Sequence, residues 1–415
     1  MFFGGMKSFR ALTRARNRLH PSKNASSRSV GFYRRVPFLN LVCFLLFMSV
    51  FSSEATDKDF LVYIGTYTGA QSKGIYVSHF DPGTGRLTSP ELAAETKNPS
   101  FLALHPNQHM LYCVGEVDEF GGKKGGAVSA FNLDSTTGKL TLINQQSSGG
   151  PGPCHVAVDR AGKCVLVANY GGGSIAALPI DGAGKPGEPS AFIQHSGSSL
   201  NRERQEGPHA HFVTTDPANQ FVLTCDLGLD KVLIYRLNPP TYSLSPNAPP
   251  SVSIKPGSGP RHLAFHPNGH FIYVINEMGS SLTVFSFDGK HGLLEEKQTI
   301  STLPENFTGE STCAEVQVHP SGKFVYGSNR GADRIVVFGA DAKTGKLTLI
   351  EHQSTQGKTP RHFAIDPTGQ WLLAENQGSN TIVIFRIDPK TGRLTSSGQV
   401  VEVGSPVCLQ FVNAH

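Results

Sequence analysis

One segment, Pro260-Arg-His-Leu-Ala-Phe-His-Pro-Asn-Gly-His-Phe-Ile-Tyr-Val-Ile-Asn-Glu277, decides the fold because the chain repeats it. It returns as Pro360-Arg-His-Phe-Ala-Ile-Asp-Pro-Thr-Gly-Gln-Trp-Leu-Leu-Ala-Glu-Asn-Gln377. Further copies lie at Pro153–Tyr170, Cys313–Arg330 and Pro99–Glu116, with a diverged copy at Ala210–Leu227. The unit is an apolar run, a turn that is typically His/Asp-Pro-x-Gly, and a second apolar run. This pattern indicates a β-hairpin.

The spacing of the copies predicts the number of repeats. Taking Asn276 as the marker, equivalent positions are Thr66, Gly115, Asn169, Asp226, Asn329 and Asn376. The intervals are 49, 54, 57, 50, 53 and 47 residues, and each leaves room for two more strands. Seven repeats of four strands predict an all-β, seven-bladed β-propeller.

The two ends of the repeat region predict how the ring closes. Residues 61–67 match only the second half of the unit, whereas 406–412 supply a lone first strand. We therefore expect the last blade to be closed by both chain ends, which removes an open sheet edge. Residues 56–415 are predicted to form a single domain. The polar stretch Pro239–Pro256 is expected to be a long excursion between strands.

Charge is unevenly distributed along the chain. The whole sequence has 37 Lys+Arg and 32 Asp+Glu, but residues 1–55 hold nine of the basic residues and one acid. The remainder is mildly acidic, which argues against a nucleic-acid partner. Gly and Pro are abundant, with 45 and 27 residues, which favours short elements joined by turns.

Residues 1–55 have the pattern of a signal peptide or N-terminal anchor. A basic region is followed by the apolar run 36–51 and by Ser53 and Ala55, which suit a cleavage site. We expect an exported protein, periplasmic or extracellular, with membrane association only if this segment stays uncleaved. If the segment is not a leader, a cytoplasmic location follows. The six cysteines outside it lack CxxC spacing and are predicted to be buried free thiols.

Polar residues gather where the first strand of each hairpin begins and the second ends, because antiparallel strands bring these points to one channel mouth. At the first-strand positions are His155, His211, Arg261, His262, Glu315, Arg361 and His362. At the second-strand ends are Tyr67, Glu116, Tyr170, Glu277, Arg330 and Gln377. Arginine forks bind carboxylate or phosphate, and histidines or carboxylates activate water. The mouth is therefore predicted to bind a small, anionic, oxygen-rich molecule.

Several of these polar residues have alternative interpretations. His105, His266 and His319 precede turns and are interpreted as structural, and Asn169, Asn276, Asn329 and Asn376 as backbone ligands at blade ends. His155, His262 and His362 suit channel-wall hydrogen bonding as well as catalysis. Arg261, Glu277 and Arg330 are interpreted as functional, the alternative being that they pair with one another. A His/Glu ring suits a divalent metal, but no local ligand spacing supports one, so neither metal nor cofactor is predicted.

The sequence resembles the seven-bladed propeller lactonase family, which includes propeller-type bacterial 6-phosphogluconolactonases and fungal carboxy-cis,cis-muconate cyclases. The matching stretches are 61–69, 153–155, 167–174, 207–211, 259–262 and 328–331. The resemblance implies hydrolysis or formation of a lactone without a known required cofactor. It also implies a site of one His, two Arg and one Glu. Arg261, Glu277 and Arg330 match that site, and the His is His211, His209 or His155.

The resemblance implies a 6-phosphogluconolactonase-like lactone hydrolase. Arg261 and Arg330 would hold the substrate anion and polarise its ester carbonyl, while His211, His155 or Glu277 activates water. The expected substrate-binding residues are His209, His262, Glu315, Arg361, Tyr67 and Tyr170. The expected partner is a small anionic sugar lactone, although export also suits an unphosphorylated one. The alternative function is a non-catalytic exported propeller that binds a carbohydrate or a protein.

Overall fold

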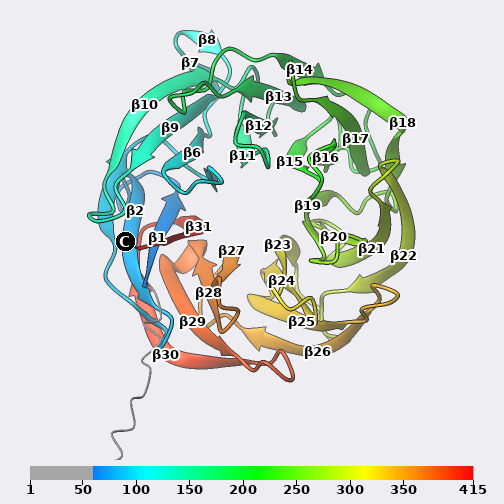
Figure 1. Cartoon of the computed structure of the whole chain (residues 1–415). Coiled ribbons are helices and arrows are strands. Elements are labelled where there is room, and N and C mark those ends of the chain that lie inside the picture. Colours follow the sequence, from blue (N-terminus) through cyan, green and yellow to red (C-terminus); the bar gives the residue numbers. More distant parts are fainter. Residues whose placement is uncertain (1–58, 415) are drawn as a thin grey trace, which may run out of the picture. The chain divides into compact units, whose positions relative to one another are not determined.

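The computed structural model describes residues 59–414, and the predicted leader lies outside this range. Seven antiparallel sheets are arranged as blades around a central channel, which confirms the predicted propeller (Figure 1). The helical structure among the described residues is a single 3-10 turn, η1 (Gln377–Ser379). No helix in residues 59–414 is long and apolar enough to cross a membrane.

Blade 1 is built from both ends of the described chain. Its innermost strand is β31 (Pro406–Asn413), which pairs antiparallel with β1 (Phe60–Thr66). Next comes β2 (Gly74–Asp81), whose outer edge pairs with both β3 (Arg86–Leu87) and β4 (Glu91–Glu95). The predicted closure is therefore confirmed, and the ring has no open edge between its first and last blades.

The other blades each contain four strands in chain order from the channel outward. Blade 2 has β5 (Leu102–Leu104), β6 (Met110–Gly115), β9 (Ala127–Leu133) and β10 (Leu140–Ser147), with a small hairpin of β7 (Glu119–Phe120) and β8 (Lys123–Lys124). Blade 3 has β11 (Pro153–Val158), β12 (Cys164–Asn169), β13 (Ser174–Pro179) and β14 (Ala191–Gln194). Blade 4 has β15 (Ala210–Thr215), β16 (Phe221–Asp226), β17 (Lys231–Asn238) and β18 (Ser243–Ser253). Blade 5 has β19 (Pro260–Phe265), β20 (Phe271–Asn276), β21 (Ser281–Asp288) and β22 (Leu293–Ser301). Blade 6 has β23 (Thr312–Val318), β24 (Phe324–Arg330), β25 (Arg334–Ala340) and β26 (Leu347–Ser354). Blade 7 has β27 (Pro360–Ile365), β28 (Trp371–Asn376), β29 (Thr381–Ile387) and β30 (Leu394–Glu402).

The apolar runs of the sequence are buried on both faces because every blade packs between two others. In β1, Phe60, Val62 and Ile64 join the core shared with blade 7, whereas Leu61 and Tyr63 join the core shared with blade 2. This alternation follows from the two-residue period of a strand. A near-continuous apolar run is therefore the sequence signature of an inner propeller strand.

The turn histidines are structural, as predicted, and they also link neighbouring blades. The Nε2 atom of His266 lies 2.9 Å from the carbonyl oxygen of Gly322 in the next blade, and His105 and His319 make equivalent contacts. Gly322 has φ +72°, and a Cβ there would come within 2.7 Å of the His266 ring. Glycine is therefore required at this turn for its conformation and for the close approach of the histidine.

The expectation for Pro239–Pro256 is wrong, because this stretch contains the outer strand β18. Its residues pair with β17, with a shift in register between Leu233 and Tyr235. An outermost strand has one unpaired edge, where proline and polar side chains are tolerated. Its composition therefore resembles that of a loop. The six cysteines of the described chain are buried free thiols, as predicted.

Candidate active site

A pocket of about 300 Å³ lies where the inner strands of several blades meet at one end of the channel. We call it the mouth pocket. Its lining residues are Glu116, Cys154, Tyr170, Arg204, His211, Glu277, Thr312, Arg330 and Arg361. Three arginines and two glutamates thus face a single cavity, and most of them occupy the ring positions of the repeat.

Glu277, which follows β20, is surrounded by three arginines. Its Oε1 accepts a hydrogen bond from Arg204 Nη2 at 2.7 Å. Its Oε2 forms ion pairs with Arg261 Nε at 3.1 Å and Arg330 Nη2 at 3.0 Å. The arginines are themselves fixed, because Arg261 Nη1 donates to the Ala314 carbonyl and Arg330 Nη2 to the Cys313 carbonyl.

This environment sets the charge of the cluster. Burial alone would raise the pKa of Glu277, but Arg330, Arg261 and Arg204 outweigh it and lower the pKa to about 2. Burial lowers the pKa of Arg261 to about 10, with repulsion from Arg361 and Arg330 adding to the effect. The Glu277 carboxylate is therefore ionised at neutral pH and holds the three guanidinium groups together.

Glu116 of blade 2 and Arg361 of blade 7 also line the mouth pocket, and Tyr67 of blade 1 joins them. Glu116 Oε2 accepts hydrogen bonds from the Tyr67 hydroxyl, at 2.8 Å, and from the Ser100 hydroxyl. Arg361 Nη2 donates to the Tyr67 hydroxyl at 3.0 Å. Tyr67 thus bridges the carboxylate and the guanidinium, and presents Arg361 to the cavity.

His211 and His155 occupy different environments. His211 lines the mouth pocket, and its buried Nδ1 has no hydrogen-bond partner among residues 59–414. His155 is packed between Phe101 and Phe212, with ring centroids 4.1 Å away on either side. Burial, then the positive charge of Arg261, lowers the pKa of both imidazoles well below 6.5, so both are neutral at pH 7.

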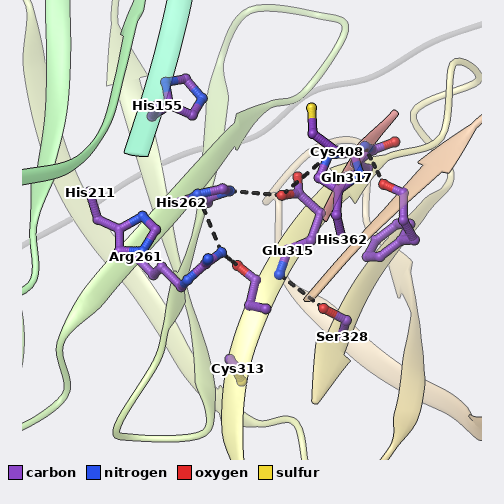
Figure 2. A network of polar contacts seen from close by, with 12 residues as sticks. His155, His211, Arg261, His262, Cys313, Glu315, Gln317, Ser328, His362 and Cys408 are labelled. Atoms are coloured by element: carbon purple, nitrogen blue, oxygen red, sulfur yellow. Dashed lines mark hydrogen bonds and ion pairs between the residues drawn. The ribbon is translucent and has the colours of Figure 1, made fainter. Parts of the chain in front are cut away.

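Figure 2 shows a second polar cluster, whose side chains are buried. His262 Nδ1 is 2.7 Å from Glu315 Oε2, and His362 Nδ1 is 3.3 Å from Glu375 Oε1. His362 Nε2 is also 3.8 Å from Glu315 Oε2. Arg261 Nη1 lies 3.3 Å from His262 Nε2 and so connects this buried cluster to Glu277.

The direction of hydrogen bonding in this cluster follows from the donors. Arginine only donates, so His262 Nε2 accepts from Arg261, and Nδ1–H of the neutral imidazole donates to Glu315. Burial raises the pKa of Glu315 to about 7, although His362 and Arg261 partly oppose this. Burial disfavours protonation of His362, but Glu375 and Glu315 outweigh it and raise its pKa.

The structure thus brings Tyr170, His211, Glu277, Arg330 and Arg361 into one pocket, whereas Arg261, His262 and Glu315 are buried outside its lining. His209 stacks on Tyr170 outside the pocket lining, with ring centroids 4.6 Å apart. The sequence analysis missed Arg204, Cys154 and Thr312, and it placed Glu116 at the channel mouth without assigning it a role. Glu116 was recognisable as the repeat equivalent of Glu277, whereas Arg204 lies in a segment that no other repeat contains.

The structural interpretation of the blade-end asparagines holds for most of them. Asn169, Asn329 and Asn376 donate from Nδ2 to the backbone carbonyls of Ser148, Thr302 and Thr355. Asn276 donates instead to the hydroxyls of Ser281 and Thr283. In the described part of the chain, no group of three His, Cys, Asp or Glu side chains is arranged to hold a metal ion.

Comparison with known proteins identifies the family. Residues 61–411 match the model described as lactonase, 7-bladed beta-propeller. The chain belongs to the seven-bladed β-propeller lactonase family. The prediction that this propeller lactonase is a lactone hydrolase is therefore confirmed.

Individual relatives agree with this assignment. The propeller lactonase is 37% identical over 354 residues to the 6-phosphogluconolactonase of Bacillus subtilis, covering 85% of this chain and 99% of that protein. It is 35% identical over 309 residues to the 6-phosphogluconolactonase of Formosa agariphila, covering 73% and 86%. Among solved structures, the periplasmic gluconolactonase of Pseudomonas aeruginosa superposes with a TM-score of 0.81 at 34% identity, covering 86% of this chain and 100% of that chain.

Proposed function

We propose that this propeller lactonase hydrolyses a sugar lactone that carries a negative charge, with 6-phosphogluconolactone as the leading candidate. The observation that carries the proposal is the excess of guanidinium groups over carboxylates at the mouth pocket, next to the neutral imidazole of His211. Arginine binds phosphate and carboxylate through paired N–H donors. The names of the relatives in Bacillus subtilis and Formosa agariphila support the same substrate class.

His211 is the proposed general base. It lines the pocket and its imidazole is neutral at pH 7, as a proton acceptor requires. Glu277 is less suited, because its pKa is about 2 and both its oxygens contact arginines. His155 is less suited because it lies between two phenylalanine rings outside the pocket lining.

The proposed reaction then uses His211 together with two arginines of the mouth pocket. Water attacks the lactone carbonyl carbon while His211 takes its proton, and the carbonyl oxygen becomes an oxyanion. Arg330 and Arg361, which line the pocket, stabilise this charge. The tetrahedral intermediate collapses, the ester C–O bond breaks, and His211 returns the proton to the departing ring oxygen. Arg261, His262, Glu315 and Tyr67 act as positioning residues, and Tyr170 and Arg204 form the rim.

The test is a pH-stat assay on residues 56–415 with 6-phosphogluconolactone, muconolactone and glucono-1,5-lactone. We expect the highest kcat/KM for 6-phosphogluconolactone. Because lactones also hydrolyse in water, the R330Q/R361Q double variant serves as the background. Equal rates with wild type and this variant on all three lactones would refute the proposal.

We also propose that residues 1–55 direct export and are removed. The apolar run 36–51 supports this, as does the resemblance to the periplasmic gluconolactonase of Pseudomonas aeruginosa. Fractionation of the native cells, with sequencing of the mature N-terminus, tests it. We expect an exported protein that begins near residue 56. A cytosolic protein that retains residues 1–55 would contradict the proposal.

A further inference from the structure

Arg204 differs from the other two arginines that contact Glu277. It lies on the connection between β14 and β15, outside the repeated hairpins. Its side chain is 40% exposed, compared with 3% for Arg261 and 14% for Arg330. It is therefore the cation of this cluster that an incoming ligand meets first.

The connection holds Arg204 firmly at the pocket. The backbone N–H groups of Glu203 and Arg204 donate to Asn201 Oδ1 at 3.0 and 3.1 Å. The buried side chain of Gln205 donates from Nε2 to the Leu227 carbonyl at 2.8 Å. The guanidinium is thus delivered by an anchored turn, although it belongs to no blade strand.

Some side-chain N–H donors of Arg204 have no hydrogen-bond partner within residues 59–414. Both of its side-chain hydrogen bonds come from Nη2, one to Glu277 Oε1 and one, at 3.2 Å, to the Tyr170 hydroxyl. Within residues 59–414, neither Nη1 nor Nε makes a hydrogen bond. If the guanidinium turns toward a ligand, Glu277 retains Arg261 and Arg330, so no buried charge is left unpaired.

We propose that Arg204 determines substrate specificity by binding the anionic group, phosphate or carboxylate, that the lactone carries away from its ester. The ester lies at His211 and Arg330 in the interior, and the remote anion lies at the rim beside Arg204 and Tyr170. The inference rests on the proposed function and deepens it. Without substrate, Glu277 fixes the position of Arg204. When substrate binds, its anionic group accepts hydrogen bonds from Nη1 and Nε of Arg204.

The experiment compares R204Q and R204K with R202Q. Arg202 is an exposed arginine of the same connection that does not line the mouth pocket, so R202Q removes an equal charge without touching the site. For 6-phosphogluconolactone we expect R204Q to lower kcat/KM by about 10- to 100-fold, mainly through KM, as for loss of a charged hydrogen bond. For glucono-1,5-lactone the change should stay within about threefold. R204K should be intermediate, and R202Q should resemble the wild type.

Muconolactone distinguishes the two sources of the anion. If R204Q lowers kcat/KM for both anionic lactones, Arg204 forms a general anion site. If it lowers kcat/KM for the phosphorylated lactone alone, Arg204 forms a phosphate site. Equal losses on charged and neutral lactones would overturn the inference, because Arg204 would then only support Glu277. So would an unchanged kcat/KM for every lactone.

Calorimetric binding of 6-phosphogluconate separates this inference from the proposed function. If the wild type hydrolyses no lactone but binds this product at least tenfold more tightly than R204Q, the anion-binding role of Arg204 stands while the proposed function fails. If the wild type is active and R204Q binds the product equally well, the inference alone fails. Denaturant unfolding of every variant verifies that the comparison is made between folded proteins.

Discussion

Glu277 and Glu315 are buried glutamates of neighbouring blades, only 4% and 6% exposed, yet their pKa values move in opposite directions. Glu277 contacts three permanently charged guanidinium groups, and its pKa falls to about 2. Glu315 contacts a neutral imidazole, and burial raises its pKa to about 7. Burial is similar in the two cases, so the chemistry of the partners decides the charge of each carboxylate.

The E277Q variant breaks the first cluster. Removing the carboxylate leaves three cations facing one another, and breaking a buried ion pair costs about 3–5 kcal/mol of unfolding free energy. We also expect kcat/KM to fall by at least about 100-fold, since the arginines lose their fixed positions. Unfolding and turnover at pH 7 measure both effects, with E206Q as the exposed control, whose side chain is 58% exposed.

Acid titration of the wild type and E277Q shows how the stabilisation by Glu277 depends on pH. Because the pKa of Glu277 is depressed from 4.5 to about 2, its stabilisation is present above pH 4.5 and is lost as pH falls toward 2. The wild type should therefore lose its advantage over E277Q across this window. A stability difference that is constant from pH 5 to pH 2 would contradict the ionic role of Glu277.

The H211A variant tests the histidine that faces the first cluster. A general base contributes about 100-fold or more to turnover, so kcat should fall by at least that factor with little change in stability. Because burial and Arg261 lower the pKa of His211, protonation of this histidine should reduce wild-type kcat/KM only at pH values well below 6.5. H155A is the matched control. It should reduce stability through lost packing against Phe101 and Phe212 while kcat remains within about tenfold.

The E315Q variant tests the second cluster. A carboxyl with a folded-state pKa near 7 binds its proton more tightly in the folded protein than in the unfolded chain. Its stabilising contribution is therefore present below pH 4.5 and is lost as pH rises to 7. We expect the wild-type unfolding free energy to decline by roughly 1–3 kcal/mol over this interval and E315Q to show a flatter profile. Parallel profiles for the two proteins would show that Glu315 does not carry this proton.

An exposed ion pair should give the smallest change in unfolding free energy. Lys73 and Glu95 lie 3.6 Å apart, with side chains 72% and 68% exposed. Solvent screening leaves such pairs worth less than about 1 kcal/mol. K73A should therefore change the unfolding free energy by less than that amount, and the change should vanish in 1 M salt. A larger or salt-independent effect would show that exposure does not explain the contrast with Glu277.

The sequence predicted the fold because the same hairpin recurs, as at Pro260–Glu277 and Pro360–Gln377, and each recurrence fixes one blade. It predicted the ring of polar residues for the same reason, since apolar scaffold positions make exceptions such as Arg261 visible. The sequence did not predict how deeply each of these polar side chains is buried. His155 and His211 occupy neighbouring repeat positions, but only the structure shows that one packs between phenylalanines and the other faces the pocket.

Arg204 and β18 escaped prediction for a related reason. Both lie where the repeat gives no guidance, Arg204 in an added connection and β18 at the outer edge of blade 4. Outer strands bury little apolar surface, so Ser243–Ser253 lacks the pattern of the inner strands. The assembly of the Glu277 cluster depends on contacts between residues up to 73 positions apart, which local patterns do not encode.

The pairing of β1 with β31 has a consequence for biosynthesis. Thr66 pairs with Pro406, which lies 340 positions later in the chain, so the partner becomes available only after roughly 20–70 s of translation at about 5–20 residues per second. Until then, β1 carries an exposed backbone edge and apolar residues that belong in two cores. The cell must therefore protect β1 of the new chain from aggregation until β31 has been synthesised. If translation stalls before β31, the ring stays open.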